Sequence, residues 1–424
     1  MQIVILTIGT EGDVRPLVAL AVGLKKLGHQ VRIATDMSCQ SPVVDHGLEF
    51  SPLTGDFMDW MRRDKDLQKR GLSTLAMAKA FQAQLLEMSQ DWPEQGRQAA
   101  QDTDLLIGNG MVYFLAQSLG EAFGIPVVET QLVPTMPSHH APIMPLPGWM
   151  KSLPPAINVG LGHLTRQIVW HVYQPVYNKV VRPQLGLAAY PRFGPYHHKK
   201  FQRPKMFAYS PCLIEPRKNW PSRIQTTGPW MLETGAAWEP PSELLDFLQA
   251  GPKPIYIGFG SMFHHDAQAF TDMIQASIEE TGQRVIIATG WGGLHVKNMS
   301  EASRDKMLSV GHIPHDWLFP RIALAVHHGG AGTTHAVLRA GIPSVVVPVF
   351  GDQPFWAQRL ERLGVAPRAL PRETLTSSDL TKAITVAAST EMRARASTVA
   401  RMMQAENGVD NAIKALRDFG LLPA

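Results

Sequence analysis

The stretch ALAVHHGGAGTTH, residues 323–335, decides the fold class. It begins with a short apolar run, Ala323–His327, of the kind that forms a strand buried on both faces of a parallel sheet. Three glycines follow, and then Thr333 and Thr334 stand in the first turn of a predicted helix. A strand, a glycine-rich turn and a helix N-terminus bind anions, because free backbone N–H groups and about half a positive charge point at the ligand. We therefore predict a phosphate site here, with the imidazole of His328 as a further donor.

The spacing of the glycines excludes two other phosphate-binding loops. No G-x-x-x-x-G-K-[ST] sequence occurs in the chain, and Gly258 and Gly260 continue into Ser-Met-Phe rather than into a G-x-G-x-x-G pattern. A Walker-type nucleotidase and a dinucleotide dehydrogenase are therefore disfavoured. A tight turn that needs glycine for backbone reasons alone is the alternative, and the coincidence of hydroxyls, imidazole and glycines argues against it.

Strands and helices alternate outward from this stretch in both directions. In the first half, the runs Ile3–Ile8 and Val31–Thr35 flank a helix that Gly28 closes, which makes a βαβ unit. The pattern predicts two α/β halves. The predicted strands are Ile3–Ile8, Val31–Thr35, Leu105–Gly108, Pro126–Glu129, Met206–Ser210, Ile255–Phe259, Arg284–Thr289, Ala323–His327 and Ser344–Val349.

Composition bounds the class of protein. A length of 424 residues fits two or three domains, and 45% hydrophobic residues with 18% charged residues argue against disorder. A net charge of +4 is too small for a nucleic-acid binder, and two cysteines make neither a disulfide scaffold nor a zinc ribbon. No apolar run reaches the ~18 residues of a membrane span. Without a signal-peptide pattern at the N-terminus, we expect a cytoplasmic enzyme.

A carboxylate follows the first predicted strand, in Gly12-Asp13. The carboxyl end of a parallel strand is where ligands bind in open α/β folds. Asp13 could there accept the proton of an attacking hydroxyl, an effect worth about 10²–10⁴ in rate. It could instead simply N-cap a helix that begins at Val14, and the residue type alone favours this second interpretation.

Two apolar segments interrupt the α/β alternation. Residues 60–92 are studded with leucine and methionine, and residues 134–155 hold seven prolines among apolar side chains. Prolines at that density exclude a helix or a central strand and predict a long loop. Pliable methionines in such a loop suit a large apolar ligand, so we expect Met136, Met144 and Trp149 to bind an acceptor.

The glycine-rich stretch and its surroundings resemble the donor-binding signature of family-1 UDP-dependent glycosyltransferases, which have the GT-B fold. PHDWLFP, HHGGAGTT, LRAG and GDQPFWA are most similar to the sterol 3β-glucosyltransferases and the macrolide and glycopeptide antibiotic glycosyltransferases, and GT-GDV-P near the N-terminus extends the resemblance to the whole chain. It implies two Rossmann-like α/β domains facing across a cleft. Their expected bounds are 1–215 for the acceptor-binding domain, 216–241 for a linker, 242–400 for the UDP-sugar domain and 401–424 for a C-terminal helix packed on the first domain.

The resemblance also implies roles for individual residues. It implies that Asp13 is the catalytic base and that the main chain at Ile313 hydrogen-bonds the uracil edge of the donor. It also implies that Asp352 and Gln353 hydrogen-bond the hydroxyls of the sugar. Ala336 stands where plant enzymes carry a Glu for the ribose. The expected donor-binding residues are Thr10, Gly12, Ser261, His312, Ile313, His328, Gly330, Gly332, Thr333, Thr334, Asp352 and Gln353.

The implied reaction is an inverting transfer of a hexose, glucose above all, from a UDP-sugar to a hydroxyl of a lipophilic acceptor, a sterol above all. A macrolide or polyphenol acceptor, a UDP-sugar epimerase and a non-catalytic UDP-sugar-binding protein are the alternatives. No cofactor and no metal are expected, because Asp64-Lys-Asp66 lies in a charge run and the histidine pairs at 139–140, 197–198 and 264–265 lack a third ligand at suitable spacing. The basic sequence His197–Lys200 allows a transient contact with a membrane surface.

Overall fold

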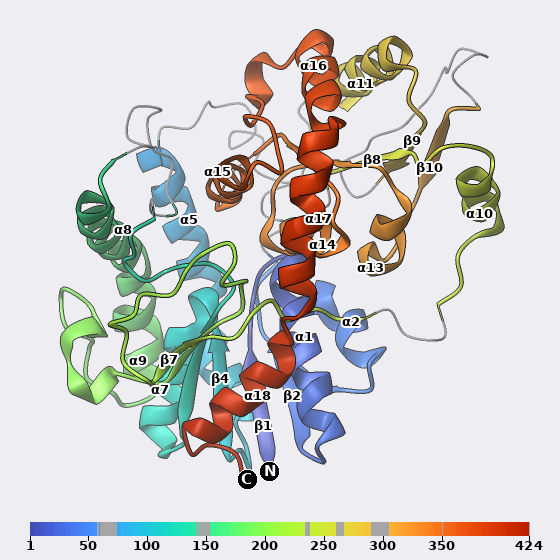
Figure 1. The fold of residues 1–424 in the computed structure, drawn as a ribbon. Helices are drawn as coiled ribbons and strands as arrows, with labels where there is room; N and C mark the ends of the chain where they lie inside the picture. Colours follow the sequence, from blue (N-terminus) through green and yellow to red (C-terminus); the bar gives the residue numbers. More distant parts are fainter. Residues whose placement is uncertain are drawn as a thin grey trace. The chain divides into compact units, whose positions relative to one another are not determined.

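The computed structural model describes residues 1–56, 59, 74–140, 143, 153–233, 238–259, 267–289, 305–349 and 351–423. The chain divides into two compact units. Unit 1 contains Met1–Leu232 and Asn407–Ala424, and unit 2 contains Glu233–Glu406. Each unit is an α/β domain built on a parallel sheet (Figure 1).

The sheet of unit 1 has the strand order β3-β2-β1-β4-β5-β6-β7. Its strand order reverses beside β1, whose neighbours are β2 and β4, and ligands bind at such a switch point. The strands are β1 (Gln2–Leu6), β2 (Gln30–Thr35), β3 (Glu49–Pro52), β4 (Leu105–Asn109), β5 (Val127–Gln131), β6 (Lys205–Phe207) and β7 (Ile224–Thr226).

The sheet of unit 2 has the order β10-β9-β8-β11-β12, so its switch point lies between β8 and β11. The glycine-rich stretch follows β11. The strands are β8 (Ile255–Gly258), β9 (Val285–Ala288), β10 (Met307–Val310), β11 (Ala325–His327) and β12 (Ser344–Val346).

Helices flank both sheets. In unit 1 they include α1 (Glu11–Lys26), α2 (Gln40–Val44), α5 (Thr74–Met88), α6 (Trp92–Ala99), α7 (Tyr113–Phe123), α8 (Pro155–Pro175), α9 (Arg182–Gln184) and α18 (Gly408–Asp418). In unit 2 they include α10 (Ser242–Gln249), α11 (Ala267–Thr281), α13 (His315–Leu318), α14 (Ala331–Ala340), α15 (Gln353–Leu363), α16 (Ser377–Ala387) and α17 (Thr390–Gln404). In the described part of the chain, no helix is both long and apolar enough to cross a membrane.

Strand β1 is buried on both faces, as its apolar run predicts. Ile3 and Ile5 belong to a core with residues of α1 and α18, whereas Val4 and Leu6 belong to a second core with residues of α7 and α8. Alternate side chains of a strand point to opposite faces, so one short apolar run supplies both cores. This double burial fixes the end of β1, and hence the turn that leads to Asp13.

The boundaries of the units differ from the expected domain bounds. The stretch expected to be a linker, 216–241, contains β7, which pairs with β6 and so joins the sheet of unit 1. At the other end, α17 runs past residue 400 to Gln404, and unit 2 continues to Glu406. Only the following helix, α18, returns to unit 1 and packs on α1 (Figure 1).

Candidate functional site

The glycine-rich loop joins β11 to α14, as the sequence predicts, and Gly330 is the N-cap of α14. Gly329 has a φ of +87°, and a Cβ there would lie 2.8 Å from Cγ1 of Val346. A Cβ at Gly330 would lie 2.5 Å from Nε2 of His328. A side chain at Gly329 would be strained and crowded, and a side chain at Gly330 would displace the imidazole of His328. The loop passes close to its neighbours and leaves the start of α14 uncovered, with Gly332 exposed.

Two polar atoms at this loop are buried without a hydrogen-bond partner among the described residues. They are Nδ1 of His328 and Oγ1 of Thr334. Burial lowers the pKa of His328 to about 4, so its imidazole is neutral near pH 7 and carries one N–H donor. Because buried polar atoms are normally paired, an orphaned imidazole beside a helix N-terminus is the mark of a ligand site. Thr334 is fully buried and Thr333 is half-buried, so Thr333 is the hydroxyl better placed for a ligand.

The sequence analysis missed a second histidine at this loop, His327. His327, fully buried at the end of β11, accepts the backbone N–H of Gly329 through Nδ1 at 3.1 Å. Its Nε2 is 3.0 Å from Oγ of Ser344 on β12, and because Nδ1 accepts, Nε2 carries the proton and donates. Burial lowers the pKa of His327 to about 3, which keeps it neutral and able to do both. His327 thus ties the loop to the neighbouring strand.

The start of α15 lies against the same loop, since a Cβ on Gly329 would come within 3.2 Å of the Gln353 carbonyl oxygen. Asp352 accepts the indole N–H of Trp356 at 2.6 Å. The amide oxygen of Gln353 accepts the backbone N–H of Val349 at 2.7 Å, and Gln353 is only 4% exposed. Both side chains are therefore held in place by hydrogen bonds within unit 2.

His312 and Ile313 follow β10. His312 is exposed, whereas Ile313 is buried. They lead into α13, which packs against α14. His315 in α13 stacks on Phe319 with ring centroids 4.2 Å apart, which stiffens this turn. Unit 2 therefore brings three loops, those after β10, β11 and β12, to the neighbourhood of α14.

Asp13 lies at the start of α1 in unit 1. The helix begins at Glu11 with Thr10 as its N-cap, so Asp13 is the third helical residue and not the cap of a helix beginning at Val14. One carboxylate oxygen, Oδ2, accepts both the N–H of Thr10 at 2.8 Å and its hydroxyl at 3.0 Å. The other oxygen, Oδ1, accepts no hydrogen bond from the described residues. It stays available for a proton.

Two features shape the surroundings of this carboxylate. Burial raises the pKa of Asp13, and the hydrogen bonds from Thr10 oppose that rise. Gly9 has a φ of +150°, and a Cβ there would overlap the Asp13 carboxylate, so glycine makes the room for it. On the other side, burial and the charge of Asp13 raise the pKa of Tyr173 in α8 to about 12. A carboxylate with a raised pKa suits proton transfer from a hydroxyl.

Family models match at both ends of the chain. Residues 3–103 match the Glycosyltransferase family 28 N-terminal domain, and residues 286–418 match the Erythromycin biosynthesis protein CIII-like C-terminal domain. Two sterol 3-beta-glucosyltransferases of Arabidopsis thaliana are 34% and 32% identical to the chain, covering 100% and 98% of it and 66% and 67% of their own length. A sterol 3-beta-glucosyltransferase of Aspergillus oryzae is 33% identical, over 98% of this chain and 30% of its own length. The chain thus spans about two thirds of the plant relatives and under a third of this fungal one.

Solved structures share the fold. The calicheamicin glycosyltransferase CalG4 aligns with a TM-score of 0.68 at 17% identity, over 99% of this chain and 98% of its own. The kitacinnamycin glycosyltransferase aligns with a TM-score of 0.66 at 18% identity, over 100% and 99%. The chain belongs to the family of the sterol 3-beta-glucosyltransferases.

In this GT-B family member the expected donor residues divide between the two units. Thr10 and Gly12 lie beside Asp13 in unit 1. Unit 2 holds His312, Ile313, His328, Gly330, Gly332, Thr333, Thr334, Asp352 and Gln353. Ser261 lies outside the described residues. Ala336 is buried in α14 and offers no polar group, so a ribose contact needs another residue.

Of the residues expected to bind an acceptor, only Met136 is described. It is half-buried and follows β5. Met144 and Trp149 lie outside the described residues, and so do Asp64–Asp66 and the histidines at 264–265. Among the residues that the structure does place, no three His, Cys, Asp or Glu side chains are grouped to hold a metal ion.

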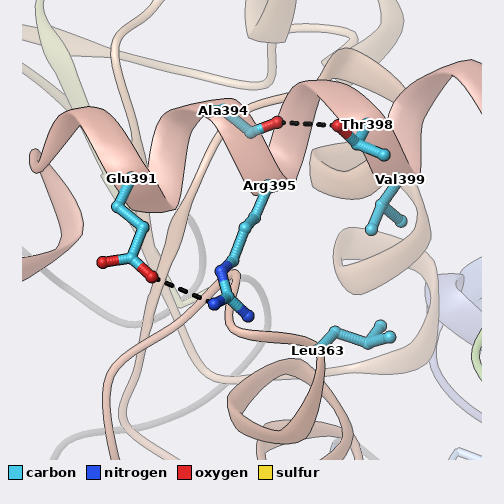
Figure 2. A pocket seen from close by; sticks show the side chains of 6 residues that line it. All are labelled: Leu363, Glu391, Ala394, Arg395, Thr398 and Val399. Atoms are coloured by element: carbon cyan, nitrogen blue, oxygen red, sulfur yellow. Dashed lines mark hydrogen bonds and ion pairs between the residues drawn. The ribbon is translucent and has the colours of Figure 1, made fainter.

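A surface hollow of about 380 Å³ lies at the far end of α15 from the glycine-rich loop (Figure 2). Its rim includes Leu363, the last residue of α15, and an ion pair in α17 between Arg395 and Glu391 at 3.0 Å. It contains none of the expected site residues. This hollow therefore does not belong to the candidate site, which the loops after β10, β11 and β12 and the buried atoms of His328 and Thr334 mark in unit 2.

Proposed function

We propose that this chain transfers glucose from UDP-glucose to the hydroxyl of a sterol, with inversion at the anomeric carbon and without a metal. The identity of 32–34% to sterol 3-beta-glucosyltransferases along nearly the whole chain supports the reaction class and the acceptor. The observation that carries the donor half is the orphaned His328 beside the start of α14. The observation that carries the acceptor half is Asp13, with its raised pKa and its open Oδ1.

In the proposed donor site, the diphosphate binds at the N-terminus of α14. Backbone N–H groups at Gly332 and Thr333 and one N–H of neutral His328 donate to its oxygens. These dipoles are fixed before the ligand arrives, because His327 holds Gly329 and the carbonyl of Gly330 accepts the N–H of Thr334 at 2.9 Å. Fixed donors supply a positive field without a metal ion.

In the proposed chemical step, Asp13 Oδ1 takes the proton of the acceptor hydroxyl while the hydroxyl oxygen bonds to the anomeric carbon. The bond between that carbon and the phosphate oxygen breaks, and the electron pair leaves on UDP. The negative charge that develops on the β-phosphate is stabilised by the donors of α14. A single in-line displacement inverts the configuration of the sugar. Asp13 belongs to unit 1, whereas the donors of α14 belong to unit 2.

The test uses the purified protein with UDP-glucose, a chelator and a mixed set of sterols, macrolides and flavonoids, followed by mass spectrometry. A hexose adduct on sterols supports the proposal. An adduct on macrolides or flavonoids alone replaces the acceptor and keeps the reaction class. Tight UDP binding with no adduct on any acceptor overturns the proposal in favour of a non-catalytic sugar-nucleotide-binding protein.

A further inference from the structure

Helix α8 carries apolar side chains on two opposite faces. One face is buried, with Trp170 fully enclosed in the second core of unit 1. The other face bears Ile157, Leu161, Leu164 and Ile168, at spacings of four, three and four residues, which places them in one line along the helix. We call these four residues the α8 stripe. A surface helix normally turns one apolar stripe inward, so a second stripe needs its own explanation.

The α8 stripe is open to solvent. Ile157, Leu164 and Ile168 are 48%, 53% and 45% exposed, and Leu161 is half-buried. Beside them, Val169 is 39% exposed. Single exposed aliphatic residues are common on proteins, but a row of them on one helix marks a binding surface.

An exposed aromatic residue lies close to the same helix. Phe193 is 63% exposed, and its backbone oxygen accepts the amide N–H of Gln167 from α8 at 2.9 Å. The indole of Trp170 donates to the backbone oxygen of Arg192 at 3.0 Å. The loop with Arg192 and Phe193 is thus fastened to α8 and adds a guanidinium and a phenyl ring at its flank.

The charge of this region is one-sided. No aspartate or glutamate occurs between Glu129 and Glu215, a stretch of 85 residues that includes nine lysines and arginines and all of α8. Exposed cations follow α8 at Lys179, Arg192 and Lys199. The flanking acids are engaged: Glu129 pairs with Lys205 at 2.8 Å, and Glu121 pairs with buried Arg182 at 3.0 Å. On α5, which packs beside α8 (Figure 1), Lys79 offsets Glu87.

We propose that the α8 stripe, with Phe193 and its flanking cations, docks on a lipid bilayer that contains anionic lipid. A helix with an apolar stripe and basic flanks lies in the plane of the membrane interface, where aliphatic side chains enter the acyl boundary and cations meet lipid phosphates. The long acid-free stretch complements a negative surface. The stripe itself has no Trp, Tyr or Arg, the residues that anchor most protein interfaces.

This proposal concerns binding to the bilayer itself and does not depend on sugar transfer. The test is cosedimentation with vesicles of phosphatidylcholine alone or with phosphatidylserine, at low and at high salt. We expect the wild-type protein to bind the anionic vesicles and to release in high salt, because screening weakens the attraction of cations to the surface. Arg192→Gln should weaken vesicle binding about fivefold, because one cation near an anionic surface contributes about 1 kcal/mol to the binding free energy.

The decisive variant is Leu164→Glu/Ile168→Glu, which should weaken vesicle binding by about tenfold or more, because two aliphatic side chains no longer enter the bilayer. The matched control is Val386→Glu/Met402→Glu, whose residues are 50% and 49% exposed on α16 and α17 of unit 2. It should bind vesicles as the wild type does. Unchanged melting temperatures show that both variants fold.

Three results would overturn the proposal. The first is no binding of the wild type to anionic vesicles, and the second is equal binding by Leu164→Glu/Ile168→Glu and the wild type. The third is a wild-type dimer that this variant converts to a monomer in analytical ultracentrifugation with no change in vesicle binding, which would assign the stripe to a second copy of the chain.

Discussion

Thr10 directs both its backbone N–H and its hydroxyl at a single oxygen of Asp13, at 2.8 and 3.0 Å. The same arrangement recurs at the start of α16, where Thr376 donates its hydroxyl to Asp379 at 2.7 Å. Yet the hydroxyl of Thr376 lowers the pKa of Asp379, whereas desolvation by burial raises the pKa of Asp13. Burial is therefore the difference between a carboxylate that only caps a helix and one that can act as a base.

Replacing Thr10 by valine should move the pH profile of sugar transfer. The variant keeps the backbone N–H but loses the hydroxyl that stabilises the charged carboxylate, so the pKa of Asp13 rises further. A general base works when deprotonated, so the acidic limb of kcat/KM should shift to higher pH. The loss of the hydrogen bond from the Thr10 hydroxyl to Asp13 costs about 1 kcal/mol of stability. Thr376→Val is the matched control, and a shift of the limb in that variant would contradict the assignment.

Replacing Asp13 by asparagine should abolish most of the turnover and stabilise the protein at neutral pH. The pKa of Asp13 is higher in the folded state than the ordinary carboxyl value, so the folded state binds the proton more tightly. The protonated carboxyl of Asp13 therefore stabilises the folded state at low pH, and this contribution to the free energy of unfolding is lost as the pH rises through the raised pKa. Because the side-chain amide of asparagine does not ionise, the variant does not lose stability as the pH rises. We expect turnover to fall about 10²–10⁴-fold.

Calorimetry at acidic and neutral pH, together with steady-state rates, measures both effects of Asp13→Asn. Retained UDP binding shows that the donor site is intact. Turnover within a few-fold of the wild type would exclude Asp13 as the base.

Replacing Gly9 by alanine should displace the Asp13 carboxylate, because the new Cβ overlaps it. The matched control is Gly28→Ala, at a φ of +85° with no atom within 4 Å of the new Cβ. Both variants bear the strain of a positive φ, roughly 1 kcal/mol or more. Only Gly9→Ala should also lose turnover, measured as kcat at saturating donor. Equal losses of kcat in the two variants would show that strain alone is responsible.

Replacing His327 by phenylalanine should weaken the binding of UDP more than that of uridine. The variant leaves the Gly329 N–H and the Ser344 hydroxyl unpaired in the core, at a cost of about 1–3 kcal/mol each, and frees the loop that meets the phosphates. Uridine lacks phosphates and should bind nearly as before. The control is Ser277→Ala, which breaks a buried hydroxyl pair with Thr381 at 3.0 Å elsewhere in unit 2. Equal losses of affinity for UDP and uridine would show that His327 supports the fold of unit 2 and has no specific effect on phosphate binding.

Binding of UDP-glucose should be nearly independent of pH from mildly acidic to mildly alkaline solution. His327 and His328, with pKa values of about 3 and about 4, stay neutral throughout that range. Isothermal titration calorimetry at several pH values measures this. If the dissociation constant of UDP-glucose instead rises tenfold as the pH increases through the ordinary histidine pKa, a charged imidazole holds the diphosphate.

The sequence predicted the inner strands of both sheets and the edge strand β12, because each contains adjacent buried apolar side chains. The strands it missed, β3, β7 and β10, are all at sheet edges. Edge strands need no continuous apolar run: β3 has no fully buried residue, and all three residues of β7 are half-buried. Because β7 was missed, the expected linker, 216–241, includes a strand of unit 1 as well as the boundary between the units.

The candidate site was only partly predictable for a similar reason. The pattern Thr10-x-x-Asp13 is a signature of a capping box and could have placed the helix start at Glu11. His327 gave one usable signal, since an imidazole in a doubly buried strand must find two partners. One of those partners, Ser344, is 17 residues away, and only the pairing of β11 with β12 brings it into reach.

The return of α18 to unit 1 has a consequence for biosynthesis. Unit 2 is one continuous stretch, 233–406, so the ribosome delivers all of it before α18. Until then the face of α1 that receives Val409 and Ile413, with Gly23 at its closest approach, has no cover. The helix that carries Asp13 therefore lacks its contacts with α18 for as long as the whole of unit 2 is being synthesised.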